Sequence, residues 1–246
     1  MKTLALLAAL LATSIATLSA CGGPGEAGKH IEAGVELQGQ GRWQEAITEY
    51  DEAIRLDPRG ADAYNNRGVA HLNLGDYEQA IRDYGEAIRL APYLAQAYSN
   101  RGTAYDNLGR HELAIADYDE AIRLDPQGAD AYNNRGAAYD DLGRFERAIQ
   151  DYEDAIRLDP QMAQARANRG NLYLHLGDYG RAVQDFGEAI RLDPLMAQAY
   201  ANRALAYSSL GMDAEAGEDI DRAVELGLDR AFLERVAEQA KQRRQP

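Results

Sequence analysis

Cysteine and histidine are scarce in this chain of 246 residues, which has one cysteine, Cys21, and four histidines. One thiol forms no intrachain disulfide and supplies no multi-cysteine metal site. The histidines lie at unrelated places in the sequence, so no predicted helix carries two of them as a metal-binding pair. The glycines follow a repeating pattern and form no phosphate-binding loop. We therefore expect no metal, no cofactor and no catalytic site, and we predict that the protein is not an enzyme.

Positive charge is scarce as well. The 26 lysines and arginines are outnumbered by 40 aspartates and glutamates, which gives a formal net charge of −14. A phosphate backbone repels such a chain, so we exclude nucleic acid as a partner. Hydrophobic residues make up 46% of the chain. That fraction is enough to bury a core and argues against disorder.

Long hydrophobic runs are missing except at the start of the chain. Leu4 to Leu18 is apolar, but it is shorter than the ~20 residues that a helix needs to span a bilayer. Lys2 precedes the run, a pattern typical of a secretory signal. The run ends in Leu18-Ser19-Ala20-Cys21, which resembles the bacterial lipobox, where small residues precede the cysteine that receives the lipid. We therefore predict a lipoprotein signal peptide over residues 1–20.

The residues after Cys21 fit a lipid anchor. Gly22-Gly23-Pro24-Gly25 cannot pack as a core element and is typical of a flexible tether, so we assign 21–26 to the lipidated cysteine and its tether. The resemblance implies several acyl chains on Cys21, as stable anchoring requires. Gly22 stands where lipoproteins retained in the inner membrane often carry aspartate, which favours the outer membrane, facing the periplasm. The alternatives are an ordinary signal peptide with an incidental Cys21, or a buried free thiol.

What the chain has in abundance is internal repetition. Five of its seven prolines are spaced 34 residues apart: Pro58, Pro92, Pro126, Pro160 and Pro194. A fixed period of this length is the signature of a solenoid, and it must be recognised before secondary structure is assigned. Six segments align without gaps: 27–60, 61–94, 95–128, 129–162, 163–196 and 197–230.

Each segment predicts two helices. In 61–94, Tyr64 and Gly68 lie one turn apart on the same helical face. Gly75 ends this first helix because glycine readily adopts the left-handed conformation. Pro92 ends the second helix because it lacks a backbone donor and clashes one turn back. Glycine and alanine at fixed positions let neighbouring helices approach closely, and tyrosine rings fill the gaps between them.

The pattern resembles the tetratricopeptide repeat (TPR). That family favours an aromatic, a small residue, an aromatic, alanine, an aromatic, alanine and proline at seven fixed positions. The third segment supplies all seven: Tyr98, Gly102, Tyr105, Ala114, Tyr118, Ala121 and Pro126. The resemblance covers residues 27–230 and implies an all-α fold, a right-handed solenoid of antiparallel helix pairs. His30 and Arg166 replace aromatics, and nothing in the sequence explains Arg166.

The last sixteen residues, 231–246, predict a C-terminal capping helix, because an uncapped solenoid exposes its core. We expect its apolar face to comprise Phe232, Leu233, Val236 and Ala240.

One polar position recurs opposite the packed face of the first helices. It is asparagine in five consecutive segments: Asn66, Asn100, Asn134, Asn168 and Asn202. In TPR proteins the first helices line the concave surface, and these residues resemble the asparagine ladder of the TPR superhelix in O-linked GlcNAc transferase, which holds an extended peptide by its backbone. A carboxamide offers both a donor and an acceptor, which complements a peptide unit. Two alternatives stay open: each asparagine bonds the adjacent repeat as a spacer, or repeat duplication copied it passively.

The middle of the predicted groove is acidic, with Asp62, Asp106, Asp130, Asp140 and Asp141. No lysine occurs between residues 30 and 240, so the lysine clamp of TPR co-chaperones is absent. We therefore expect the partners to be extended and basic peptide segments of envelope proteins. The sequence predicts a lipid-anchored adaptor in the cell envelope, with a groove that we expect to be open. The alternative is a structural assembly factor, resembling pilotin-type lipoproteins that chaperone pilus or secretin subunits.

Overall fold

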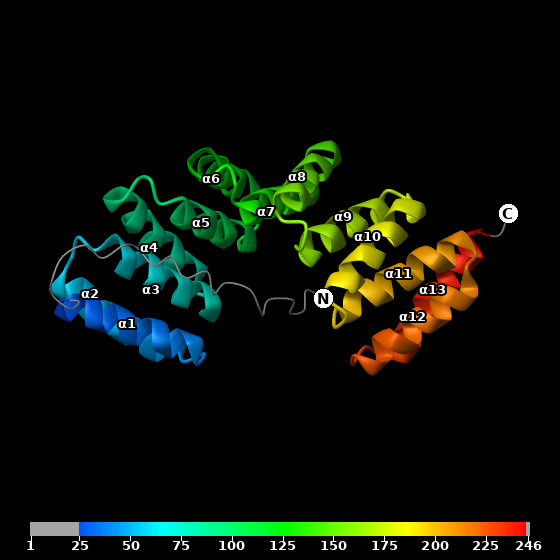
Figure 1. Ribbon diagram of the computed structural model, residues 1–246, viewed down its shortest axis with the longest axis horizontal. Helices are drawn as coiled ribbons and strands as arrows, with labels where there is room; N and C mark the ends of the chain where they lie inside the picture. The colour runs from blue at the N-terminus through cyan, green and yellow to red at the C-terminus, as the bar shows by residue number, and fades with distance from the viewer. Residues whose placement is uncertain (1–24, 245–246) are drawn as a thin grey trace.

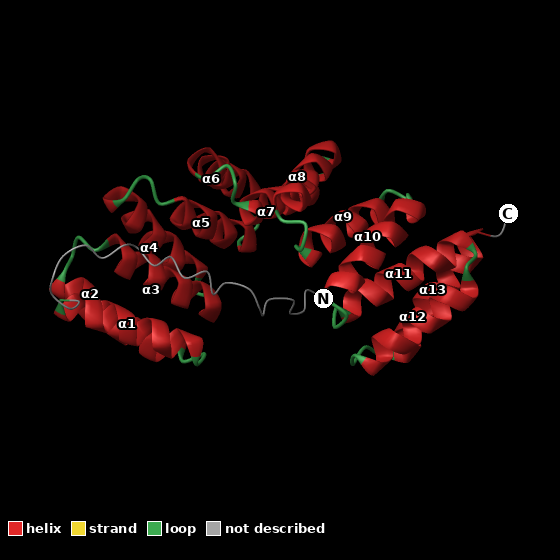
Figure 2. Ribbon diagram, viewed as in Figure 1, coloured by secondary structure: helices red, strands yellow, loops and turns green. Residues whose placement is uncertain are grey.

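The computed structural model describes residues 25–244, and within them every regular element is a helix (Figure 2). The predicted signal peptide, Cys21 and residues 22–24 of the tether lie outside the described residues. The first six helices are α1 (Glu26–Gly39), α2 (Trp43–Leu56), α3 (Ala61–Leu74), α4 (Tyr77–Leu90), α5 (Ala95–Asn107) and α6 (His111–Leu124). The next six are α7 (Ala129–Asp141), α8 (Phe145–Leu158), α9 (Ala163–His175), α10 (Tyr179–Leu192), α11 (Ala197–Leu210) and α12 (Asp213–Glu225), and α13 (Arg230–Arg244) follows. The predicted all-α TPR solenoid is confirmed.

The turns follow directly from the local sequence. Each helix pair reverses at a glycine with φ between 68° and 86°, a conformation that other residues adopt at a cost: Gly41, Gly75, Gly109, Gly143, Gly177 and Gly211. Four of the turns between pairs carry Asp-Pro, whereas the turn after α4 has Ala91-Pro92. In those four turns the aspartate side chain accepts a hydrogen bond from the backbone N–H two residues later, as Asp125 does from Gln127 at 3.1 Å. That bond holds the turn while proline keeps the preceding helix from continuing.

Inside each of the first five pairs, a glycine on the first helix faces an aromatic ring on the second. A Cβ atom built on Gly68 would lie 2.7 Å from the Tyr84 ring, and one on Gly102 would lie 2.7 Å from Tyr118. Four of the rings, those of Tyr50, Tyr84, Tyr118 and Phe186, are at most 1% exposed. The sixth pair replaces both partners, because Ala204 on the first helix accompanies the smaller Ile220 on the second. The two helices of a pair can therefore approach closely, because the glycine on the first helix leaves room for the large ring on the second.

The pairs stack into a curved solenoid, seen as an arch in Figure 1. Among the described residues, the first helices of consecutive pairs touch each other, whereas no two second helices of α2–α12 do. The first helices are thus closer together, which places them on the inner side of the curve. The concave surface is formed by α1, α3, α5, α7, α9 and α11.

Two sequence departures have local explanations. Arg166 stands where the fourth repeat has Tyr132, and its guanidinium donates to the carbonyl of Pro160 at 3.2 Å, as the Tyr132 hydroxyl does to Pro126 at 3.5 Å. Arginine therefore keeps the hydrogen bond that tyrosine makes to the preceding turn. In the first repeat, His30 bonds Glu49 at 2.7 Å and joins α1 to α2.

The C-terminal helix α13 caps the solenoid with a different face from the predicted one. Leu233, Ala237 and Ala240 are at most 8% exposed and Val236 is half-buried, but Phe232 is 52% exposed. Including Phe232 in the apolar face was wrong. Its ring instead lies 5.6 Å from the guanidinium carbon of Arg235. The reason is that α13 packs mainly against α11 and less against α12, which turns its N-terminal ring towards solvent.

Candidate functional site

The five asparagines lie on the concave helices, but the surface around them is less open than expected. Asn100 is only 9% exposed, and the other four are partly buried. The expectation of an open stripe was wrong for Asn100, because curvature brings the first helices together. Next to them, one position earlier, Asn133 and Ser99 are also buried. The asparagines are therefore held firmly in place by neighbouring helices.

Hydrogen bonds divide the five residues into two groups. Asn168 donates its amide nitrogen to Asn133 of the preceding repeat at 3.0 Å, and Asn202 donates to Asn171 at 2.6 Å. Their oxygens accept from glutamines one turn earlier on the same helices, at 2.8 Å in both cases. Both polar atoms of Asn168 and Asn202 are thus engaged inside the solenoid. These two residues act as the spacers that the sequence left open as an alternative.

In the other three asparagines the side-chain amide nitrogen is not used inside the solenoid. The oxygens of Asn66, Asn100 and Asn134 accept bonds from Asn65, Gln96 and Asn133, respectively. Their amide nitrogens make no hydrogen bond to any residue that the structure describes. Since one such donor occurs per repeat, the concave surface of α3, α5 and α7 presents a row of three N–H groups.

The predicted acidic residues differ in exposure. Asp62, Asp130 and Asp141 are exposed, while Asp106 and Asp140 are partly buried near the C-terminal ends of α5 and α7. Asp130 is exposed as a residue, but neighbouring groups partly shield its carboxylate from water, and this shielding together with the charge of Asp159 raises the pKa of Asp130 above its usual value. Burial and the neighbouring Asp141 likewise raise the pKa of Asp140. Both carboxylates are thus ionised at a cost, which a cationic side chain from a partner would relieve.

A second repeating ion pair holds the helices that present this surface, and the sequence reasoning missed it. Arginine seven residues into each of repeats two to six forms a bidentate pair with an aspartate sixteen residues later. The arginines are Arg67, Arg101, Arg135, Arg169 and Arg203, and the aspartates are Asp83, Asp117, Asp151, Asp185 and Asp219. The signal was available, because both residues recur at the 34-residue period.

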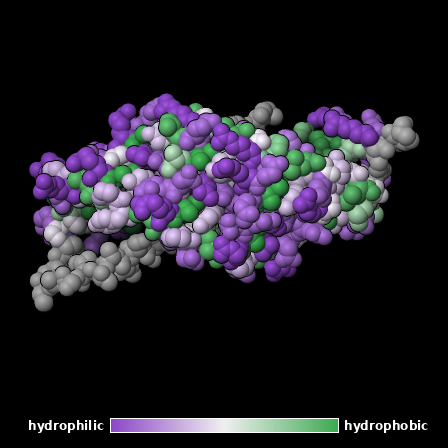
Figure 3. Space-filling view, turned by 90° about the horizontal axis from the view of Figure 1, so that it is seen from above, coloured by the Kyte–Doolittle hydropathy of each residue, from purple (hydrophilic) through white to green (hydrophobic). Residues whose placement is uncertain are grey.

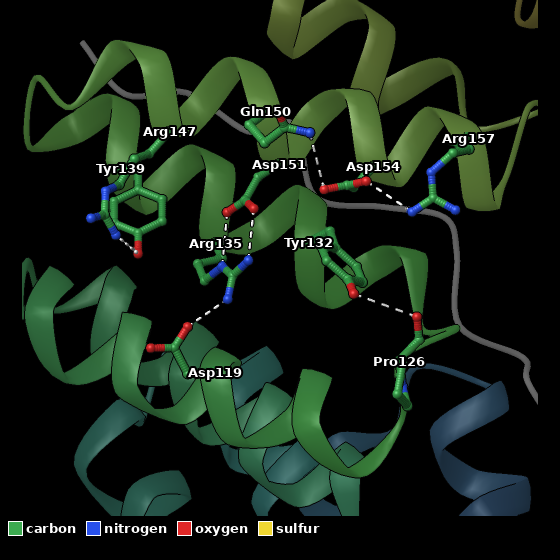
Figure 4. A network of polar contacts seen from close by, with 10 residues as sticks. All are labelled: Asp119, Pro126, Tyr132, Arg135, Tyr139, Arg147, Gln150, Asp151, Asp154 and Arg157. Carbon is green, nitrogen blue, oxygen red and sulfur yellow. Dashed lines mark hydrogen bonds and ion pairs between the residues drawn. The ribbon is translucent and has the colours of Figure 1, made fainter.

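The pair in the fourth repeat shows the arrangement (Figure 4). Arg135 on α7 bonds Asp151 on α8 at 2.7 and 2.8 Å, and its third nitrogen bonds Asp119 on α6 at 2.5 Å. Its guanidinium carbon also lies 5.6 Å from the Tyr132 ring and 6.0 Å from that of Tyr139. One arginine thus joins three helices and two repeats, and fixes the direction in which α7 presents its concave side.

Near the C-terminal end of the solenoid, α9, α11 and α13 border a cleft with a mixed polar and apolar lining. Leu174, Leu205 and Val236 line it together with His175, Gln239, Arg243 and other residues, around a volume of about 360 Å³. The face seen from above in Figure 3 is mostly hydrophilic with small scattered apolar areas. A few large apolar side chains are exposed, among them Tyr93 and Leu195. In the described part of the chain, no helix combines the length and apolar character needed to cross a membrane.

The stacked helix pairs and their inner surface define a helical-repeat protein of the kind that binds other proteins. Family models described as tetratricopeptide repeats match residues 31–95, 95–127, 129–162, 163–194 and 197–226. The chain belongs to the tetratricopeptide repeat family. It is therefore a protein-interaction scaffold, and no catalytic family is matched.

Solved structures share the fold. MamA is 27% identical with a TM-score of 0.59, and the match covers 67% of this chain and 96% of MamA. PilW, described as a type IV pilus biogenesis factor, is 20% identical with a TM-score of 0.74 over 80% of this chain and 91% of its own. YrrB, described as a TPR protein with an unusual peptide-binding site, is 23% identical with a TM-score of 0.60 over 78% and 97%. Among curated proteins, no match is found.

Proposed function

We propose that the protein is an adaptor that binds extended, basic segments of envelope proteins in its concave groove. The observation that carries the proposal is the row of free amide donors of Asn66, Asn100 and Asn134. A peptide in extended conformation presents carbonyl oxygens at regular intervals, and each donor can hold one of them. The exposed and partly buried carboxylates beside the row would select lysine or arginine side chains on the same segment.

The expected affinity is modest. Each hydrogen bond contributes about 0.5–1.5 kcal/mol net, so three bonds and a few charge contacts approach the roughly 8 kcal/mol of micromolar binding. Ordering the peptide offsets part of this gain. An exchangeable complex suits an adaptor that serves several partners, because backbone contacts are common to all of them.

The groove is tested with a partner segment obtained by crosslinking from a photoreactive residue at the exposed position of Asn73, then synthesised and titrated. Asn100→Ala with Asn134→Ala removes two free donors, and we expect affinity to fall about tenfold, corresponding to about 1.4 kcal/mol. Asn168→Ala with Asn202→Ala is the matched control. It removes amides that bond inside the solenoid, so it should lower thermal stability while leaving affinity near that of the wild type.

Charge is tested separately with Asp130→Asn and Asp140→Asn. This pair should weaken segments that contain lysine or arginine and flatten the salt dependence of binding, since exposed charges are screened beyond about 8 Å at physiological salt. If the Asn100 and Asn134 double variant binds as tightly as the wild type with its helicity intact, the ladder does not hold the partner. The partner would then be sought on a wider surface, as expected of an assembly factor.

We also propose that Cys21 anchors the protein to the outer membrane. The support is the lipobox-like Leu18-Ser19-Ala20-Cys21 and the glycine-rich residues that follow. Cys21→Ser should yield an exported protein that fractionates with soluble periplasmic proteins, because acyl chains need the thiol. Fractionation and metabolic labelling with a palmitate analogue measure this. A Cys21→Ser variant that stays as firmly in the membrane fraction as the wild type would overturn the anchor.

A further inference from the structure

Three potential metal ligands from different helices meet at the edge of the concave surface. The Nδ1 atom of His111, at the start of α6, lies 2.6 Å from an Asp106 oxygen at the end of α5. It also lies 4.0 Å from an oxygen of Asp141, the last residue of α7. The three ligand atoms all lie within 4.8 Å of one another. Histidine and two carboxylates from two adjacent repeats thus converge on one point.

The spacing needs small side-chain movements to match that around an ion. Ligand atoms about 2.1 Å from a tetrahedral metal ion lie about 3.4 Å apart. The hydrogen-bonded atoms of His111 and Asp106 are closer than this, at 2.6 Å, and the Asp141 oxygen is farther from His111, at 4.0 Å. Shifts of under about 1 Å give the required spacing, and the Asp141 side chain is 59% exposed and therefore able to move.

A buried tyrosine lies close to the same carboxylates. Tyr152 on α8 is 2% exposed. Burial is the main reason that the pKa of its hydroxyl lies well above its usual value, and the charges of Asp140, Asp141 and Asp106 add to the shift. Tyr152 is therefore protonated and does not add to the negative charge around the three residues.

Positive charge is lacking at the same place. Among the described residues, no lysine or arginine forms an ion pair with Asp140 or Asp141, whereas the aspartates of the repeating Arg–Asp pairs are all neutralised. A divalent cation would compensate the negative charge of these two carboxylates.

We propose that Asp106, His111 and Asp141 bind a divalent transition-metal ion that bridges the third and fourth repeats. Imidazole nitrogen with carboxylate oxygens favours Zn²⁺ or Ni²⁺ over Mg²⁺, which prefers oxygen ligands alone. Water would fill the remaining positions. Bound metal would fix α5, α6 and α7 relative to one another and reduce the negative charge of the groove.

The test is calorimetric titration of the purified, untagged chain carrying Cys21→Ser, which removes the single thiol as a competing ligand. We expect one equivalent of Zn²⁺ to bind and to raise the melting temperature, with Mg²⁺ at the same concentration giving no heat. His111→Ala should weaken Zn²⁺ binding at least tenfold. Asp141→Asn, at an exposed side chain that the fold does not need, should weaken it as well.

His30→Ala is the matched control, since His30 pairs with a single carboxylate, that of Glu49, and should leave Zn²⁺ binding unchanged. Loss in the His111 and Asp141 variants alone supports the site. Absence of binding in the folded Cys21→Ser protein overturns the proposal, as does equal affinity in Asp141→Asn and the parent. Equal weakening in His30→Ala also overturns it, because it would indicate diffuse surface binding. Peptide binding plays no part in these measurements, so the groove hypothesis stands or falls independently.

Discussion

Replacing Arg135 with alanine should destabilise the middle of the solenoid by about 3–5 kcal/mol, the cost of leaving a buried charge without its partner. Asp151 is 4% exposed and receives both of its charge-assisted bonds from Arg135. The substitution also removes the bond to Asp119 and the contacts with two tyrosine rings. Because solenoid stability is a sum of repeat and interface terms, the loss should concentrate in repeats three to five. Urea unfolding and hydrogen exchange measure both its size and its location.

The defect should depend on pH in a defined direction. Burial raises the pKa of Asp151, and Arg135 offsets part of that shift. Without the arginine, the folded-state pKa rises further above the unfolded value of about 3.9. Protonation of Asp151 then favours the folded state of the variant. The contribution of Asp151 to stability is therefore fully present at low pH and is lost as pH rises through the folded-state pKa. The difference from the wild type should therefore be largest at neutral pH and shrink towards about pH 4.

A matched control is Arg123→Ala, which breaks an exposed pair with Glu120 on one helix face. Exposed pairs of this kind contribute little, so that variant should unfold like the wild type. Arg135→Met with Asp151→Leu replaces the buried pair by apolar side chains and should recover most of the stability. A small effect of Arg135→Ala at neutral pH, or an equal effect of Arg123→Ala, would show that the repeating pair does not hold the helices together.

The fold was predictable because the residues that end the helices and let them pack recur within one 34-residue period. Proline, the positive-φ glycine and the glycine facing an aromatic recur at the same spacing in the first five repeats, so each of these copies supports the same interpretation. Gly102 and Tyr118 illustrate this, since their contact is local to one helix pair and is visible in the sequence as a small residue and a ring at fixed positions.

The site was less predictable, because its properties depend on how repeats stack. Whether Asn168 faces a partner or bonds Asn133 is decided by the distance between α7 and α9, which the sequence does not state. The predicted exposure failed at Asn100 for the same reason. A ligand pair on one helix is visible in a sequence, whereas the proposed ligands Asp106, His111 and Asp141 come from three helices. Contacts across repeats are the part that composition and period leave open.

The C-terminal helix also depends on stacking, and deleting residues 231–246 should destabilise the last repeats. The deletion exposes a cluster in which Leu233 and Ala237 pack against Ala201, Ala204 and Ile220. Burying a leucine contributes roughly 1.5–3 kcal/mol and each further methyl group about 0.8 kcal/mol, so we expect a loss of about 3–5 kcal/mol. Hydrogen exchange should show fraying from α12 and α11 inward, with α5 to α8 still protected.

Two point variants separate packing from mere chain length. Leu233→Ala, at a residue 8% exposed, should cost about 2–3 kcal/mol through the cavity it leaves, whereas Phe232→Ala, at a residue 52% exposed, should cost little. Equal effects of the two substitutions, or a uniform loss of protection in all repeats after the deletion, would mean that α13 does not cap the solenoid through its Leu233 face.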